Sequence, residues 1–239
     1  MKVLFRYVVF LLGLSLSVLC YVIAQTSFNR RPYQEIVVAV YPAETPFISV
    51  DTVNKLLIQK MKSSTATLKD GIALNEVENQ LKSHNMVANA ELYTTISGKL
   101  MAEIFQRKPI AKVVGQKLFY IDSDAKKMPL SPSYTASVPI IRGEPNERDF
   151  ERLRDAIEVL QTHPIYGDDV VGLVQISDSW YELILESQPL EIELGDLRRL
   201  HAKMNNYAAF MIKAQKDNLL ERYRKISLAF DGQVVCTKI

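Results

Sequence analysis

This chain of 239 residues contains little cysteine, little histidine and almost no excess charge of either sign. Its two cysteines, Cys20 and Cys236, lie at opposite ends of the sequence, so no structural disulfide is expected. The 29 basic and 27 acidic residues leave a net charge of +2 and no sustained basic face for a nucleic acid. With 48% hydrophobic and 23% charged residues, the composition is instead typical of one or two folded domains.

The sequence also lacks the motifs of common enzyme classes. Its three histidines, His84, His163 and His201, stand on separate segments, and none has a second histidine or cysteine at a spacing typical of metal ligands. It has no G-x-S-x-G, phosphate-binding loop or HExxH motif. Asp122 and Asp124 begin a calcium-loop spacing that is not completed, so a solvated turn is expected there. The sequence therefore predicts no catalytic residue, no metal and no cofactor.

One long uncharged segment lies at the N-terminus. Residues 7–24 carry no charged side chain and approach the ~20 residues that cross a bilayer core. A cleavable signal peptide is the alternative, with Val22 and Ala24 before the cleavage site, although its apolar region is usually only ~7 to 15 residues long. We expect a cytoplasmic stub over residues 1–6, one transmembrane helix over residues 7–24, a tether over residues 25–33 and an exported body.

Residues 34–113 have the pattern of a small α+β unit. A β-branched run at residues 36–40 predicts a strand, and Ser49 can cap the helix that follows. Two helices are expected, each with one apolar stripe: Val53, Leu56, Leu57 and Met61 in the first, and Leu74, Val77 and Leu81 in the second. Asn75 and Glu78 offer a capping box to the second helix. Alternating residues around Gly98 then predict a hairpin, which gives the order strand, helix, helix, strand, strand.

Residues 114–239 combine strand-like runs with two amphipathic helices. Helical spacing of apolar residues covers residues 147–162 and again residues 197–211. Asp231 and Gly232 form the strongest short hairpin signal in the chain, between the alternating runs at its C-terminus.

These segments resemble the FtsQ/DivIB family of cell-division proteins. A β-α-α-β-β unit directly after a membrane span is similar to the POTRA domain of that family, which usually closes with E-R-x-P-x-A. The corresponding residues here are Gln106, Arg107, Pro109 and Ala111, with glutamine in place of the glutamate.

The resemblance continues through the second half of the chain. Residues 118–122 (LFYID) are similar to the family's "YxID" strand, and Leu194-Gly195 with Lys203 to its "LG…K" step. The last hairpin resembles the family's terminus, although Ser227 and Ala229 depart from its pattern. The expected fold is α+β: a single N-terminal transmembrane helix, a POTRA domain over residues 34–113, and a mostly antiparallel β-domain with flanking helices over residues 114–239.

The resemblance implies a non-enzymatic scaffold at the division septum of the bacterial cytoplasmic (inner) membrane, with a cytoplasmic N-terminus and a periplasmic body. It implies FtsB and FtsL as protein partners, further divisome contacts through the POTRA domain, a link between early and late division proteins, and control of septal peptidoglycan synthesis. We expect a partner segment to add to the exposed terminal strand. The predicted partner-binding residues lie in the last hairpin and the basic cluster before it: Leu228, Phe230, Gln233, Val234, Val235, Cys236, Thr237, Lys238, Arg222 and Arg224.

A second class of protein is also compatible with the sequence. A membrane-anchored or secreted envelope enzyme, or a ligand-binding module of the envelope, would have the same N-terminal segment followed by a folded body. Loss of partner binding on deletion of residues 230–239 would distinguish the scaffold from this alternative.

Overall fold

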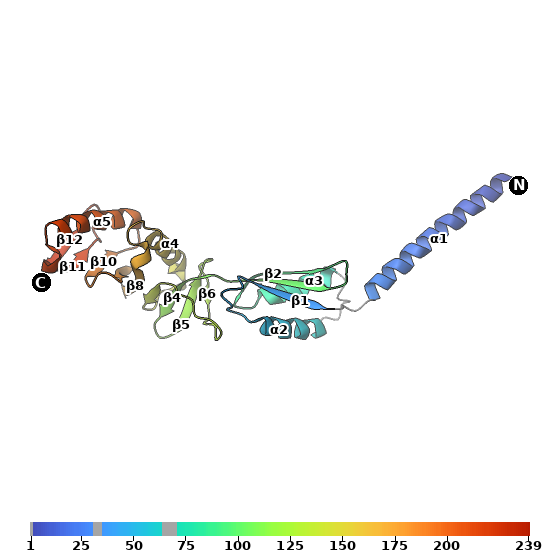
Figure 1. The fold of residues 1–239 in the computed structure, drawn as a ribbon, viewed down its shortest axis with the longest axis horizontal. Helices are drawn as coiled ribbons and strands as arrows, with labels where there is room; N and C mark the ends of the chain where they lie inside the picture. Colours follow the sequence, from blue (N-terminus) through green and yellow to red (C-terminus); the bar gives the residue numbers. More distant parts are fainter. Residues whose placement is uncertain (1, 31–34, 64–70) are drawn as a thin grey trace. The chain divides into compact units, whose positions relative to one another are not determined.

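The computed structural model describes residues 2–30, 35–63 and 71–239. Helix α1 (Lys2–Arg30) begins the chain and is 29 residues long (Figure 1). The predicted tether is therefore helical over residues 25–30, and its residues 31–33 lie outside the described part. Over the described residues, no helix is both long and apolar enough to cross a bilayer. The transmembrane helix at residues 7–24 stays a prediction.

The chain divides into two compact units, residues 1–106 and residues 107–239. The predicted boundary after Val113 lies too late in the chain, because strand β4 (Pro109–Val114) pairs only within the larger sheet of the second unit. Beyond α1, the first unit contains β1 (Ile36–Tyr41), α2 (Val50–Ser63), α3 (Gly71–Lys82), β2 (Val87–Thr94) and β3 (Leu100–Gln106). This is the predicted order of elements.

The sheet of the first unit has the order β1-β3-β2, with β1 parallel and β2 antiparallel to β3. Alternate residues of β3 are fully buried, as expected for a strand covered on one face by helices. Ser49 caps α2 as predicted, since its Oγ accepts a hydrogen bond from the Thr52 amide at 3.1 Å. Gly98 has φ +81 in the β2–β3 turn, the left-handed conformation that glycine adopts without strain.

Two side chains of the first unit have roles that differ from the expected ones. α3 begins at Gly71, so Asn75 and Glu78 lie inside it and form no capping box. Glu78 Oε1 accepts a hydrogen bond from the Leu92 amide of β2 at 2.6 Å instead. The Gln106 amide accepts from the Ile48 amide at 3.0 Å and donates to the Pro42 carbonyl at 2.9 Å. A glutamate could not make that donation, which gives the departure from the family motif a structural reason.

The second unit is one mixed sheet of nine strands in the order β12-β11-β10-β9-β8-β7-β4-β5-β6 (Figure 1). Its further strands are β5 (Leu118–Asp122), β6 (Lys127–Met128), β7 (Ile140–Arg142), β8 (Val170–Ser177), β9 (Trp180–Leu185), β10 (Glu191–Gly195), β11 (Tyr223–Ser227) and β12 (Val235–Lys238). Five strand pairs are antiparallel and three are parallel. The sheet is thus mostly antiparallel, as expected, with a parallel step at β10–β11 that the sequence did not predict.

Helices α4 (Phe150–Gln161) and α5 (Leu200–Lys216) pack their apolar faces on this sheet to form one core. Short 3-10 turns at residues 147–149, 167–169 and 220–222 complete the unit. Gly195 ends β10 with φ +69, and a Cβ there would lie 2.8 Å from the Ala229 Cβ. The strand-to-helix step therefore requires glycine, because both the backbone conformation and the contact with the last hairpin exclude a side chain.

Candidate functional site

Strand β12 forms one end of the nine-stranded sheet, next to β11. Ser227 pairs with Val235 and Lys225 with Thr237, while the Ile239 amide donates to the Arg222 carbonyl at 3.1 Å. The Leu228 amide donates to Glu193 on the other side of β11. By the alternation of an antiparallel ladder, the odd-numbered residues of β12 face β11 with their amide and carbonyl groups. The backbone groups of Cys236 and Lys238 therefore point away from the sheet.

The predicted site residues of the last hairpin separate into exposed and supporting ones. Gln233, Val235, Thr237 and Lys238 are exposed, and Phe230 is 56% exposed in the connecting loop rather than in a strand. Val234 and Cys236 are half-buried and pack against the core. Leu228 is 1% exposed and belongs to the core itself. Leu228 can therefore support the hairpin from below but cannot contact a partner on the surface.

The basic residues before the hairpin also differ in their surroundings. Arg222 and Arg224 are both exposed, and Arg224 occupies an irregular step in the ladder where β12 offers no paired residue. Lys225 Nζ instead lies 3.3 Å from Glu182 Oε1 on β9 and 3.4 Å from Glu193 Oε1 on β10. The two arginines thus remain the candidates for steering an acidic partner, while Lys225 joins strands β9, β10 and β11.

Glu193 is at the centre of a network that sequence reasoning missed. The Trp180 indole N–H donates to Glu193 Oε1 at 2.8 Å, from the start of β9. Partial burial acts to raise the pKa of Glu193, but hydrogen bonds from Ser227 and Trp180 and the charge of Lys225 outweigh it, so the pKa lies below its ordinary value. The charged network ties β10 to β11 and so holds the strand on which β12 pairs. No local motif marks it, because its members come from three strands.

A second polar anchor joins β10 to α5. Lys203 is 5% exposed, and its ammonium donates to the Leu194 and Asp196 carbonyls at 2.7 Å each and to Asp196 Oδ1 at 3.0 Å. Burial acts to raise the pKa of Asp196, yet hydrogen bonds from Lys203 and Arg198 lower it overall. These bonds explain why a lysine follows the Leu-Gly pair in the sequence. Its ammonium satisfies backbone carbonyls that are left free where the strand turns into the helix.

Cys236 has no features of a reactive thiol. Burial raises the pKa of its thiol, which keeps the sulfur protonated near neutral pH, and a protonated thiol is a poor nucleophile. Its side chain packs on the core-facing side of β12. Cys236 therefore contributes to the edge through its backbone and its packing.

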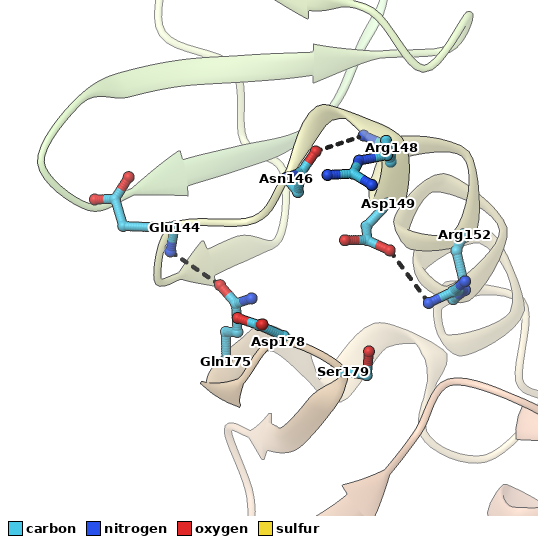
Figure 2. A pocket seen from close by; sticks show the side chains of 8 residues that line it. All are labelled: Glu144, Asn146, Arg148, Asp149, Arg152, Gln175, Asp178 and Ser179. Atoms are coloured by element: carbon cyan, nitrogen blue, oxygen red, sulfur yellow. Dashed lines mark hydrogen bonds and ion pairs between the residues drawn. The ribbon is translucent and has the colours of Figure 1, made fainter.

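A polar cleft of about 470 Å³ lies between the start of α4 and the β8–β9 turn (Figure 2). Figure 2 shows contacts among its lining residues: the Glu144 backbone amide donates to Gln175 Oε1 at 2.9 Å, and the Arg152 side chain pairs with Asp149 at 3.2 Å. The Arg148 amide donates to Asn146 Oδ1, the cap of the short turn before α4. These contacts hold the segment before α4 and the first turn of the helix in place.

The remaining candidates from the sequence lie apart from one another, and His163 is buried with no hydrogen-bond partner for its Nε2 among the described residues. His163 stacks on Tyr166 at 5.7 Å, and burial lowers the pKa of His84. Asp122 is buried rather than solvated: it accepts hydrogen bonds from the Asp124 and Lys126 amides and pairs with Arg107 at 3.2 Å. Over the described residues, no three histidine, cysteine or acidic side chains gather as a metal site would require.

The fold and this edge define a class of protein: a POTRA-like domain followed by a mixed β-domain that ends in an exposed strand. Residues 35–105 match the POTRA-like domain, and residues 108–237 match the family described as FtsQ/DivIB, C-terminal related. The second match covers more than half of the chain. The chain belongs to the FtsQ/DivIB family of cell-division proteins.

Two individual proteins are similar to this chain to different degrees. The chain is 27% identical over 177 residues to the cell division protein FtsQ of Salinibacter ruber, covering 66% of this chain and 67% of that protein. The major extracytoplasmic domain of DivIB from Geobacillus stearothermophilus, a bacterial cell division protein, matches 47% of this chain and 95% of its own length at 13% identity. Its TM-score of 0.32 is too low to establish a common fold.

Proposed function

We propose that this chain is a non-enzymatic, membrane-anchored scaffold of the bacterial division machinery. It links early and late division proteins and regulates septal peptidoglycan synthesis by binding partners of the FtsB and FtsL type. The anchor lies in the cytoplasmic membrane, the N-terminus is cytoplasmic, and both folded units lie outside the cytoplasm at the septum. Membership in a family of cell-division proteins supports the setting. The exposed strand β12 supports the mode of binding.

The observation that carries the proposal is the free edge of β12. The outward amide and carbonyl groups of Cys236 and Lys238 have the spacing that an added strand requires. An extended partner segment therefore gains main-chain hydrogen bonds without any rearrangement of the sheet. Exposed Val235 and Thr237 then contact alternate side chains of that segment, which gives the contact its specificity.

The proposed anchor rests on residues 7–24, an uncharged run within α1 that approaches the ~20 residues needed to cross a bilayer core. Apolar side chains from Phe10 to Ile23 are exposed on all sides of the helix. Resistance of the full chain to carbonate extraction tests the anchor, and a reporter fused after Ile239 tests the orientation. A reporter active in the cytoplasm would contradict it.

The experiment for the edge uses proline at Lys238. Proline has no amide hydrogen, so Lys238→Pro removes one outward donor but none of the bonds to β11. Lys238→Ala is the matched control, because it removes the same side chain and keeps the donor. We expect Lys238→Pro to weaken capture of an FtsB/FtsL-type complex by the full-length protein at least about tenfold, and Lys238→Ala to weaken it little.

Equal binding by the two variants would contradict strand addition at β12. An unchanged unfolding transition for Lys238→Pro must accompany the result, so that loss of binding reports on the edge and not on the fold. Thr237→Pro supplies the opposite case, because its amide faces β11 and its loss should destabilise the hairpin.

A further inference from the structure

The turn between β2 and β3 lies at the end of the first unit where the chain arrives from α1. β1 runs parallel to β3 with Ile36 opposite Leu100, and the Leu100 amide donates to the Glu35 carbonyl at 2.9 Å. Glu35 is thus bonded directly beside the turn formed by residues 95–99. Figure 1 shows this turn and the start of β1 at the same end of the sheet.

Ile96 is at the tip of this turn and is 102% exposed, so no neighbouring residue covers its side chain. The turn itself is well ordered by hydrogen bonds. The Thr95 amide donates to the Lys99 carbonyl and the Gly98 amide to the Thr95 carbonyl, each at 2.9 Å. The Lys99 amide also donates to Thr95 Oγ1 at 3.1 Å. The fold therefore presents an isoleucine side chain on a fixed support.

The connection from α1 to this end is short. α1 ends at Arg30 and Glu35 is already bonded to the sheet, so five peptide steps at most ~3.6 Å each separate the two points, or about 18 Å. The helix continues six residues beyond residue 24, which adds only about 9 Å along its axis. If α1 crosses a bilayer, the tip of the turn must lie within a few tens of ångströms of that bilayer.

We propose that the β2–β3 turn docks on the surface of the membrane that α1 anchors, with Ile96 inserted among the lipid headgroups and upper acyl chains. This inference rests on the membrane anchor of the proposed function and goes beyond it, because it assigns a second, peripheral lipid contact to the first unit. The contact limits the orientations that the unit adopts relative to the membrane.

The charges around the turn are compatible with a lipid surface. Thr95, Ile96 and Ser97 are uncharged, and the Ser97 hydroxyl, which bonds Thr95 Oγ1 at 2.9 Å, can also contact a headgroup phosphate. Glu35, at the start of β1, pairs with Lys99 at 2.6 Å, which offsets its charge. Tyr93 is 43% exposed beside the turn and donates its hydroxyl to Glu103 at 2.8 Å. An exposed tyrosine next to an apolar tip is typical of side chains at a membrane interface.

The test places a fluorescent side chain at the tip. Trp180 is the only tryptophan, so Ile96→Trp in a Trp180→Phe background gives a single probe in the full-length protein. The protein is reconstituted in vesicles of phosphatidylethanolamine and phosphatidylglycerol with brominated acyl chains, which quench at short range. Tyr41→Trp in the same background is the matched control, since Tyr41 is 45% exposed at the opposite end of β1.

We expect the emission of the probe at position 96 to shift to shorter wavelength and to be strongly quenched by the brominated lipid. The probe at position 41 should be quenched several-fold less and should remain accessible to aqueous iodide. Carbonate extraction of the same vesicles reports on α1 separately. A chain retained by the membrane whose position-96 probe responds only to iodide overturns the lipid contact alone. A chain released by carbonate overturns the anchor and the lipid contact together. Shielding of position 96 without quenching by lipid indicates a protein contact and overturns the proposal.

Discussion

The nine-stranded sheet ends differently on its two sides. At one end β6 has only two residues, Met128 is fully buried, and the Lys127 ammonium lies 4.4 Å above the Phe119 ring. At the other end β12 has four residues, none of them fully buried. Very short edge strands prevent unwanted pairing, whereas longer exposed ones permit it. The comparison supports the proposal that a partner segment adds at the β12 edge.

The first unit supports this interpretation with a third edge. Glu78 Oε1 accepts the Leu92 amide of β2 at 2.6 Å, so an outward backbone donor of that strand is already satisfied by a helix side chain. Within the described part of the chain, no side chain bonds the outward backbone groups of Cys236 and Lys238 in this way. Substitutions at a closed edge should lower the free energy of unfolding, and substitutions at an open edge should weaken partner binding. The following predictions distinguish these two effects.

The largest expected effect on stability is at the closed edge. Met128→Ala removes a fully buried side chain and should lower the free energy of unfolding of the second unit by about 2–5 kcal/mol, measured by urea denaturation. Partner affinity per folded molecule should not change. Val235→Ala at the open edge, where the side chain is 42% exposed, should cost less than about 1 kcal/mol. The reverse ranking would contradict the comparison.

The next largest effect on stability is expected at the joint between β10 and α5, which supports the open edge. Lys203→Met removes the hydrogen bonds to the buried Leu194 carbonyl and to two partly buried oxygens of Asp196, and should cost about 2–3 kcal/mol of unfolding free energy. Lys213→Met, on the exposed face of the same helix, is the control and should be close to neutral. If both variants unfold at the wild-type urea concentration, Lys203 does not stabilise the joint.

A smaller effect depends on pH. Because the pKa of Glu193 is lower in the folded chain than in the unfolded one, its stabilising contribution is complete above the unfolded value and is lost as the pH falls through the folded value. Stability near the open edge should therefore decline below about pH 4.5. Glu193→Gln should flatten that decline, with Trp180 fluorescence as a local measure. An identical acid profile for this variant would remove Glu193 from the account.

The smallest effect is electrostatic. Changing Arg222 and Arg224 to glutamine should slow association with an acidic partner segment at low salt by a few-fold, which is about 0.5–1 kcal/mol. Association rates measured at two salt concentrations check this, because the difference should vanish at high salt. Lys216→Gln, an exposed change elsewhere in the unit, is the matched control. Equal slowing by the control would contradict a specific role for the two arginines.

Much of the fold could be predicted from short-range patterns in the sequence. The β-α-α-β-β order, the Ser49 cap, the Gly98 turn and the position of the last hairpin all depend on residues close together in the chain. The unit boundary was misplaced because residues 109–114 alternate in the same way as the strands before them. Pairing with β5, which follows directly, and with β7, further along the chain, assigns β4 to the second unit.

The position of the candidate site in the chain could be predicted from the sequence, but the exposure of its side chains could not. The Asp-Gly turn located the hairpin, yet Leu228 was expected to be accessible and is a core residue. The alternation of apolar and polar residues around Leu228 does not reveal which face of the sheet α5 covers. The network of Trp180, Glu193 and Lys225 was missed because the parallel pairing of β10 with β11 brings residues together across the whole of α5.

Backbone amide exchange of the last strand tests the central claim most directly. In the free full-length protein, the amides of Thr237 and Ile239 should exchange slowly because they face β11, and those of Cys236 and Lys238 should exchange fast. Saturating FtsB/FtsL-type partner should protect Cys236 and Lys238 and leave the inward amides as they were. Unchanged fast exchange at both positions in a saturated complex would contradict strand addition at β12.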